Sequence, residues 1–430
     1  MTWQNDGIGS EAWWQEQQTQ GIPRIEPQQD GTCLVTFFWR DPQGSETTSH
    51  TQRVWINITG VTDHHQRHPP QSLMHVASSD VWYWQTVLPS HWRGSYCLMP
   101  DRQASDFSGE ADMHALRHWW REKFSAAQAD ALNPLRSWSG GRGMGVSPLH
   151  LPDAPDQQVW RAVDEGRAPA LQVQVQVQVQ VQQWDSALLG NRRRVWLYAT
   201  GEAQHGPRPL AILLDGQFWA QQMPIAGPLQ QLTAAGKLPP AVYLFIDIID
   251  REHRSRELPC NPQFWQAVQQ ELLPQVARWI PYDAQPARTL VAGQSFGGLA
   301  AVFAALHFPH TFGNALSLSG SFWWPERGNP HGWLLQALDH GLAPRQPLRF
   351  WLEAGQREGL ILQANQQLQQ QLTAAGYQVH YQPVEGGHDA LCWRGGLLDG
   401  LQALWRNPNS FITPDVNRSD SKFSDERHYD

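Results

Sequence analysis

The fold is decided by residues 288–306, RTLVAGQSFGGLAAVFAAL. The first five residues predict a buried strand and the last nine predict an apolar helix. Between them, residues 293–297 match G-x-S-x-G, a sharp strand-to-helix turn that exposes a serine at a helix N-terminus, where backbone N–H groups can hold an oxyanion. A side chain at Gly293 or Gly297 is expected to clash with neighbouring backbone. Ser295 is therefore the candidate nucleophile, and the alternative is a structural serine at a tight turn.

The region around this turn alternates apolar strands with helical segments from about residue 190 onward. The expected strands cover 194–198, 210–214, 241–249, 289–292, 315–319, 348–353 and 379–384, and the expected helices cover 262–279, 298–307 and 360–375. Near-continuous apolar strands separated by helices predict a parallel sheet covered on both faces. The fold class is therefore α/β for a C-terminal domain over residues 151–409.

The first part of the chain has a different pattern. Residues 33–39, 53–60 and 81–88 are rich in β-branched and aromatic residues and are separated by turn-forming clusters. Short strands at this spacing predict a β-sandwich-like N-terminal domain over residues 1–150. The Gly- and Pro-rich segment 140–155 predicts the linker between the two domains.

Two segments are unusual in composition. Residues 171–182, LQVQVQVQVQVQ, alternate strictly and predict a solvent-edged strand that starts the second domain. No charge or proline interrupts this segment, which is also the pattern of an aggregation-prone edge. The last residues, 410–430, are polar and charged and predict a disordered tail.

Charge and composition exclude several classes of protein. The chain has 430 residues with 32 basic and 40 acidic side chains, so no excess of Lys and Arg is present to bind a nucleic acid. Its four cysteines are far apart and predict neither a zinc site nor a disulfide framework. The first twenty residues lack a basic and an apolar region, and no long apolar window follows, so we expect a cytoplasmic protein with no membrane partner. The cluster His64, His65 and His68 is more typical of a solvated loop than of a metal site, and no metal is predicted.

A nucleophilic serine needs a base and, in a triad, an acid that orients the base. His388 follows the predicted strand 379–384 in the sequence VEGGHD, so the loop position and the flexible glycines favour it as the base. The acid is expected after the strand 348–353. Glu358 in the following loop is favoured, Glu353 at the strand end is the second candidate, and a Ser–His pair without an acid is the third.

The oxyanion donors are expected to be backbone N–H groups. Phe296 directly follows the nucleophile, and Gln217 follows Gly216 in the loop after an early strand. The alternative for Gln217 is an ordinary strand-to-helix loop.

Basic residues near the site would indicate an anionic substrate. Residues 250–258, DREHRSREL, follow the strand 241–249, so they lie at the carboxyl end of the sheet, where ligands bind. Arg254 and Arg256 are the candidate substrate-binding residues, and the alternative is a solvated charged loop.

Longer stretches of the chain resemble the enterochelin (enterobactin) esterase family over roughly residues 10–405. They are RDPQGSE from residue 40, ITGVTDHHQ from 58, WRGSYC from 92, LLDGQFWAQ from 213, ELPCN from 257, AGQSFGGL from 292, LEAGQRE from 352 and GGHDALCWRGG from 386. The resemblance implies an N-terminal β-sandwich-like domain and a C-terminal α/β-hydrolase domain. It also implies a cytoplasmic serine esterase that hydrolyses the trilactone ester bonds of ferric enterobactin-type siderophores to dihydroxybenzoylserine units and so assists iron release.

By motif, the resemblance implies Ser295 as nucleophile, His388 as base and Arg254 as a residue associated with the anionic catecholate complex. The partner is then a ferric catecholate siderophore. Iron arrives bound to that substrate, so no cofactor is expected. Because such a complex also has aromatic faces, exposed tryptophans could stack on it. The candidates are Trp219, Trp323, Trp324 and Trp393.

Two other functions fit the same features. An esterase for feruloylated polysaccharides can combine a β-sandwich with the same catalytic fold, but the lack of a signal sequence speaks against it. A protein that binds the siderophore without cleaving it would keep the fold with an inert serine. The sequence does not indicate an oligomeric state.

Overall fold

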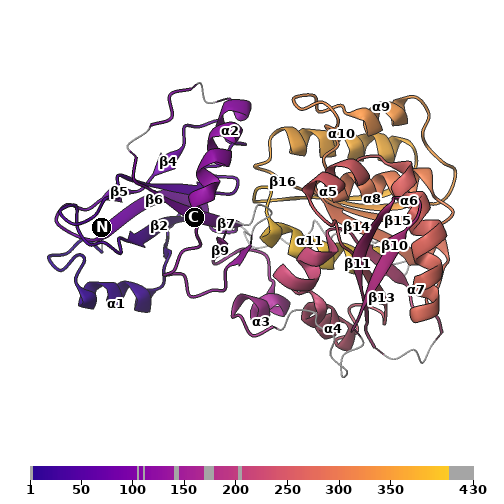
Figure 1. Cartoon of the computed structure of the whole chain (residues 1–430), viewed down its shortest axis with the longest axis horizontal. Helices are drawn as coiled ribbons and strands as arrows, with labels where there is room; N and C mark the ends of the chain where they lie inside the picture. The colour runs from indigo at the N-terminus through magenta and orange to yellow at the C-terminus, as the bar shows by residue number, and fades with distance from the viewer. Residues whose placement is uncertain are drawn as a thin grey trace, which may run out of the picture.

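The computed structural model describes residues 3–103, 106–109, 112–139, 145–168, 179–201 and 206–405. Two sheet-based parts lie side by side, the N-terminal part in indigo to purple and the C-terminal part in magenta to yellow (Figure 1). The last strand of the N-terminal part ends at His150, and the first described strand of the C-terminal sheet begins at Val179.

The N-terminal part is built from two antiparallel sheets with strand orders β1-β2-β6-β5 and β4-β3-β7-β9-β8. The strands are β1 (Arg24–Pro27), β2 (Thr32–Arg40), β3 (Arg53–Ile58), β4 (Gln71–Ser72), β5 (Met74–His75), β6 (Val81–Pro89), β7 (Arg93–Asp101), β8 (Trp138–Ser139) and β9 (Gly145–His150). Phe37 of one sheet and Ile56 and Leu98 of the other belong to a single buried core. The predicted sandwich-like packing is therefore confirmed, and β2, β3 and β6 match the three predicted strands. Helices α1 (Glu11–Gln20) and α2 (Met113–Lys123) and a short 3₁₀ turn, η1 (Phe124–Ala126), complete this part.

The predicted linker over 140–155 is wrong for its central residues. Gly145–His150 forms β9, which pairs with β7 and buries Val146 and Leu149 in the apolar cores. Gly145 serves close packing rather than flexibility, since a Cβ there would lie 3.0 Å from the Ala129 backbone nitrogen. Residues 140–144 lie outside the described part of the chain.

The C-terminal part contains one sheet of eight strands in the order β10-β11-β13-β12-β14-β15-β16-β17. The strands are β10 (Val179–Ser186), β11 (Asn191–Ala199), β12 (Leu210–Leu213), β13 (Val242–Ile246), β14 (Thr289–Gln294), β15 (Asn314–Leu318), β16 (Arg349–Gly355) and β17 (Gln378–Val384). The strands from β13 to β17 run parallel, as predicted. The prediction is wrong for β11, which is antiparallel to both neighbours. A short turn through Gly190 joins it to β10 as a hairpin.

Only the end of the Val–Gln repeat is described. Residues 179–182 belong to β10, which is the edge strand of the sheet, as the alternation predicted. Residues 171–178 and the predicted disordered tail at 410–430 lie outside the described residues.

Helices cover both faces of this sheet, as predicted. Their bounds are α3 (Arg161–Asp164), α4 (Ala226–Ala234), α5 (Arg251–Glu257), α6 (Pro262–Ala267), α7 (Leu273–Trp279), α8 (Phe296–His307), α9 (Trp333–Asp339), α10 (Leu360–Ala374) and α11 (Ala390–Trp405). Side chains of α6, α7, α8 and α10 share one buried core with the sheet, and those of α4 and α11 share a second core on the other face. Among the described residues, no helix is long and apolar enough to cross a membrane.

The two parts are joined by buried polar contacts close to the predicted base. The Ser95 backbone N–H and hydroxyl both donate to Asp389 Oδ2, at 2.7 and 2.5 Å. The backbones of Gly60 and Gly387 approach so closely that a Cβ on Gly60 would lie 2.9 Å from the Gly387 Cα. These contacts hold β7 and the loop after β3 against the loop that carries His388.

Candidate active site

Ser295 lies at the turn between β14 and α8, with φ 56° and ψ −117°. A non-glycine residue with these backbone angles is strained by about 1–3 kcal/mol, so the surrounding packing must hold it in this conformation. The predicted clash is confirmed at Gly293, where a Cβ would lie 2.5 Å from the Gly297 carbonyl carbon. The prediction of a clash is wrong at Gly297, where an added Cβ would lie 3.4 Å from its nearest atom, an ordinary van der Waals contact. Instead Gly298 is the second constrained position, since a Cβ there would lie 2.5 Å from Ser317 Oγ.

Several hydrogen bonds fix the serine turn. The Ser295 N–H donates to the Leu318 carbonyl at 2.9 Å, and the Ser295 carbonyl accepts from the Ser321 N–H at 3.0 Å. The Ser295 and Ser321 hydroxyl oxygens lie 3.2 Å apart. Ser321 was not predicted, because nothing in its local sequence distinguishes it from other serines.

His388 and Glu358 form a close pair. His388 Nδ1 lies 2.6 Å from Glu358 Oε1, and Glu358 Oε2 accepts from the Gly355 N–H at 2.7 Å. The carboxylate is fully buried, and the imidazole packs edge-on against Trp393 with ring centroids 4.7 Å apart. Because an ionised carboxylate only accepts hydrogen bonds, Nδ1 carries the proton and Nε2 is left to act as a base.

The other candidate acid, Glu353, is placed differently, and so is Asp389, the neighbour of His388 in the sequence. Glu353 is buried in β16, and burial, together with nearby Asp399 and Glu358, raises the pKa of its carboxyl well above the usual range. Among the described residues, no hydrogen bond joins Glu353 to His388. Asp389 accepts hydrogen bonds from Ser95 instead. The geometry therefore favours Glu358.

Ser295 and His388 line the same cavity of about 930 Å³, which is lined by residues of both the N-terminal and the C-terminal part. Within the described residues, the Ser295 hydroxyl bonds to Ser321 and not to His388. Catalytic hydrogen bonds are often long in the absence of substrate and tighten when it binds.

The candidate oxyanion donors line this cavity as well. Phe296 is the first residue of α8, so its N–H belongs to the positive end of that helix. Gln217 is preceded by Gly216, where a Cβ would lie 2.5 Å from the Ile246 nitrogen. This close approach to β13 brings the Gln217 backbone to the carboxyl end of the sheet.

Arg254 lines the cavity but already has a partner. Its Nε and one terminal nitrogen donate to the two carboxylate oxygens of Asp215, at 2.5 and 2.9 Å, and the same terminal nitrogen donates to the Gln294 carbonyl at 3.2 Å. Its guanidinium carbon lies 5.7 Å from the centroid of the Phe296 ring. Arg254 thus ties the loop before Gln217 to the serine turn.

Arg256 lies outside the residues that line the cavity. Its side chain is 57% exposed and lies 3.9 Å from Glu252, one helical turn away. The structure therefore brings Arg254, and not Arg256, to the candidate site.

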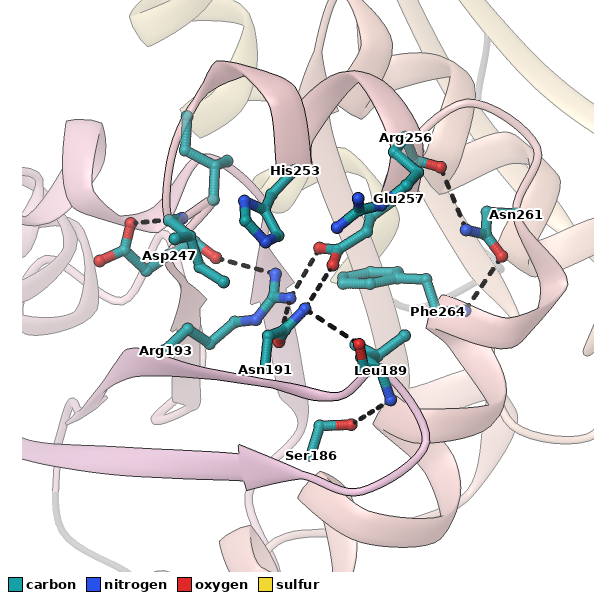
Figure 2. Close-up of polar contacts among 12 residues, drawn as sticks. Ser186, Leu189, Asn191, Arg193, Asp247, His253, Arg256, Glu257, Asn261 and Phe264 are labelled. Atoms are coloured by element: carbon teal, nitrogen blue, oxygen red, sulfur yellow. Dashed lines mark hydrogen bonds and ion pairs between the residues drawn. The ribbon is translucent and has the colours of Figure 1, made fainter.

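Helix α5, which carries both arginines, is anchored by a buried network on β11 (Figure 2). Glu257 accepts from Arg193 at 2.6 Å and from Asn191 at 2.7 Å. Arg193 also donates to the Asp247 carbonyl at 3.3 Å. Both members of the ion pair are nearly inaccessible to solvent, so this network fixes the end of α5 that follows Arg254.

The N-terminal part supplies cavity residues that the sequence did not predict. The rings of His64 and His65 lie against each other at a tilt of 36° with centroids 4.2 Å apart, and the His65 ring lies 6.1 Å from that of His388. Arg117 and Arg121 of α2 line the same cavity. No group of three His, Cys, Asp or Glu side chains suited to a metal ion occurs in the described part of the chain.

The candidate tryptophans divide into two groups. Trp323 and Trp393 line the cavity. Trp219 is buried in the core, where its Nε1 donates to Gln294 at 3.3 Å, so the expectation of an exposed ring is wrong. Trp324 lies outside the lining.

Fold and site together define a serine hydrolase of the α/β-hydrolase type, a carboxylic ester hydrolase with an additional N-terminal domain. Residues 34–160 match the family model "Enterochelin esterase, N-terminal", and residues 186–404 match "Putative esterase". The chain belongs to the enterochelin esterase family. It is 50% identical over 401 residues to an iron(III) enterobactin esterase of Escherichia coli, covering 93% of this chain and 97% of the relative. A second such esterase, from Dickeya dadantii, is 47% identical, with 92% and 93% covered.

Solved structures agree with this assignment. The enterobactin esterase of Shigella flexneri, crystallised in the presence of enterobactin, superposes with a TM-score of 0.84 at 49% identity, covering 93% of this chain and 98% of that one. The ferric enterobactin esterase of Salmonella typhimurium gives the same TM-score at 50% identity, with 92% and 98% covered.

Proposed function

We propose that this enzyme hydrolyses the trilactone ester bonds of ferric enterobactin-type siderophores and releases dihydroxybenzoylserine units. The observation that carries the proposal is the 2.6 Å contact of Glu358 with His388, which lines the same cavity as Ser295. Relatives named iron(III) enterobactin esterase support the choice of substrate. The cytoplasmic location and the absence of a protein cofactor belong to the same proposal, with iron arriving on the substrate.

In the proposed reaction, Ser295 Oγ attacks a lactone carbonyl while His388 Nε2 takes the hydroxyl proton. Glu358 stabilises the imidazolium that forms. The N–H groups of Phe296 and Gln217 hold the negative carbonyl oxygen of the tetrahedral intermediate. When the ester C–O bond breaks, His388 gives its proton to the leaving serine hydroxyl of the siderophore.

The second half of the reaction reverses these roles. Water, deprotonated by His388, attacks the acyl group on Ser295, and the tetrahedral intermediate collapses with return of the proton to Ser295 Oγ. Each cycle opens one ester bond, so three cycles convert a trilactone into separate dihydroxybenzoylserine units.

The cavity suits a large ligand. Its volume of about 930 Å³ lies near the upper end of the range of about 300–1,000 Å³ for small-molecule sites. Trp323 and Trp393 provide aromatic surface on its wall. The Shigella flexneri esterase has also been crystallised in the presence of 2,3-dihydroxy-N-benzoyl-serine, the expected product unit.

The test replaces the nucleophile. Ser295→Ala should reduce the rate of trilactone opening by roughly 10⁴-fold or more, as in other triad hydrolases. Product release is followed by chromatography on ferric and iron-free enterobactin, with Ser125→Ala, an exposed serine outside the cavity, as the matched control. A Ser295→Ala enzyme that keeps near-normal turnover would overturn the proposal.

A phosphonate probe tests the non-catalytic alternative. The wild type should be labelled on Ser295, and Ser295→Ala should not. Unlabelled wild-type protein that still binds the siderophore would identify a binding protein instead of an esterase.

A further inference from the structure

Helix α2 presents a row of side chains to the cavity. Met113, Arg117 and Arg121 are spaced four residues apart, so they lie on one face of the helix, and all three line the cavity. The adjacent face buries Leu116 and Trp120 and fixes α2 on the N-terminal part. In Figure 1, α2 lies on the side of this part that faces the C-terminal domain.

Arg117 has an unusual environment. Its Nε is buried without a hydrogen-bond partner among the described residues. A buried guanidinium nitrogen without an acceptor is costly, and arginines in such positions are normally paired. Two other cations of this region have carboxylate partners, Arg53 in Asp106 and Lys123 in Asp101. The Arg117 Nε is therefore placed for an acceptor that the described residues do not supply.

The cavity wall is cationic although the whole chain is acidic. Its arginines outnumber its carboxylates, the arginines being Arg117, Arg121, Arg251, Arg254 and Arg327 and the carboxylates being Asp63, Asp215 and Asp389. All three carboxylates already accept hydrogen bonds, Asp215 from Arg254, Asp389 from Ser95, and Asp63 from the backbone N–H groups of Gly60 and His65. The wall therefore attracts an anionic ligand of the size of the cavity.

We propose that Arg117 and Arg121 bind the anionic catecholate oxygens of the substrate, so that the N-terminal domain forms part of the recognition site opposite the serine turn. This inference rests on the proposed function. A catecholate carries two adjacent oxygens, and a guanidinium presents paired N–H donors that match such an arrangement. Iron binding deprotonates the catechol groups. The ferric complex therefore makes stronger charge-assisted contacts with the arginines than the iron-free compound does.

The experiment compares Arg117→Gln, Arg121→Gln and the double variant with Arg102→Gln, an exposed arginine of the same domain outside the cavity. Each is assayed on ferric enterobactin, iron-free enterobactin and p-nitrophenyl butyrate, an uncharged ester. Binding of ferric enterobactin is measured separately by tryptophan fluorescence in the Ser295→Ala background.

Loss of either arginine should raise KM and Kd for ferric enterobactin about 10-fold to 100-fold with little change in kcat, as expected for one charge-assisted contact. The effect should be smaller on the iron-free compound and absent on the uncharged ester. Arg117→Lys should restore part of the affinity because it keeps the charge, and Arg102→Gln should behave as wild type.

Two outcomes would overturn the inference. One is unchanged KM and Kd for ferric enterobactin in the double variant. The other is an equal loss of activity on all three esters that Arg117→Lys does not relieve, which would assign the arginines a structural role. Neither outcome would contradict the proposed function, which is tested separately by the loss of trilactone hydrolysis in Ser295→Ala.

Discussion

Glu358 and Glu353 differ by five positions and are both buried, yet only Glu358 contacts the imidazole. Glu358→Gln keeps the size of the side chain and removes the charge that stabilises the His388 imidazolium. We expect kcat to fall about 10²-fold to 10⁴-fold with KM nearly unchanged, since Glu358 is fully buried and does not line the cavity. Steady-state kinetics on ferric enterobactin measures both constants.

Glu353→Gln is the matched control for Glu358→Gln. Burial raises the pKa of the Glu353 carboxyl well above its usual range, so the amide resembles the neutral form that the fold already favours. Activity should stay within a few-fold of wild type. A larger loss of kcat in Glu353→Gln than in Glu358→Gln would contradict the assignment of the acid.

Among the elements, those with a local signal could be predicted from the sequence. The strand β14 and the helix α8 are apolar throughout, and the G-x-S-x-G turn between them carries its own steric requirement. Strand β7 was missed because all its residues from Arg93 to Met99 are buried, so no alternation marks it. It lies between β3 and β9 and also contacts α11 of the other domain, which removes the exposed face that a sandwich strand normally shows.

The element that carries Arg254 depends on one buried ion pair. Glu257→Gln would leave Arg193 as an uncompensated charge that is nearly inaccessible to solvent (Figure 2). We expect the free energy of unfolding to fall by about 3–5 kcal/mol, the usual cost of breaking a buried pair. Urea denaturation followed by tryptophan fluorescence measures this loss.

Glu252→Gln provides the comparison on the same helix. Glu252 faces Arg256 at 3.9 Å, and both side chains are largely exposed, so the change in stability should stay below about 0.5 kcal/mol. Equal effects of Glu257→Gln and Glu252→Gln would show that the buried network does not anchor α5.

At the scale of the whole molecule, the candidate catalytic residues could be picked out from the sequence because each follows a strand of one sheet. The opposite wall of the cavity could not. His65 and Arg117 reach the site only because the N-terminal domain docks on the loop that carries His388, through contacts such as Gly60 with Gly387. Contacts between such distant positions leave no local pattern in the sequence.

The docked domains share a second buried polar cluster. Arg93 of β7 donates from Nε to His150 Nδ1 at 2.8 Å, and Arg394 of α11 pairs with Asp164 at 2.6 Å. Burial, followed by the charges of Arg394 and Arg93, lowers the pKa of His150 from the usual 6.5 to about 3. A proton on His150 would therefore place a third positive charge in this cluster.

Lowering the pH should reduce the free energy of unfolding through the protonation of His150. In the unfolded chain His150 takes up a proton as the pH falls below 6.5, whereas in the folded chain it stays neutral until about pH 3. Between these two pH values the unfolded state thus binds more protons than the folded state. The free energy of unfolding therefore falls progressively with pH, by about 2 kcal/mol at pH 5. His150→Gln keeps an acceptor for Arg93 without titrating, so it should lose less stability than wild type between pH 7 and pH 5. Urea midpoints at both pH values, with the exposed His118→Gln as control, measure the difference; an identical pH dependence in His150→Gln and wild type would exclude His150 as the cause.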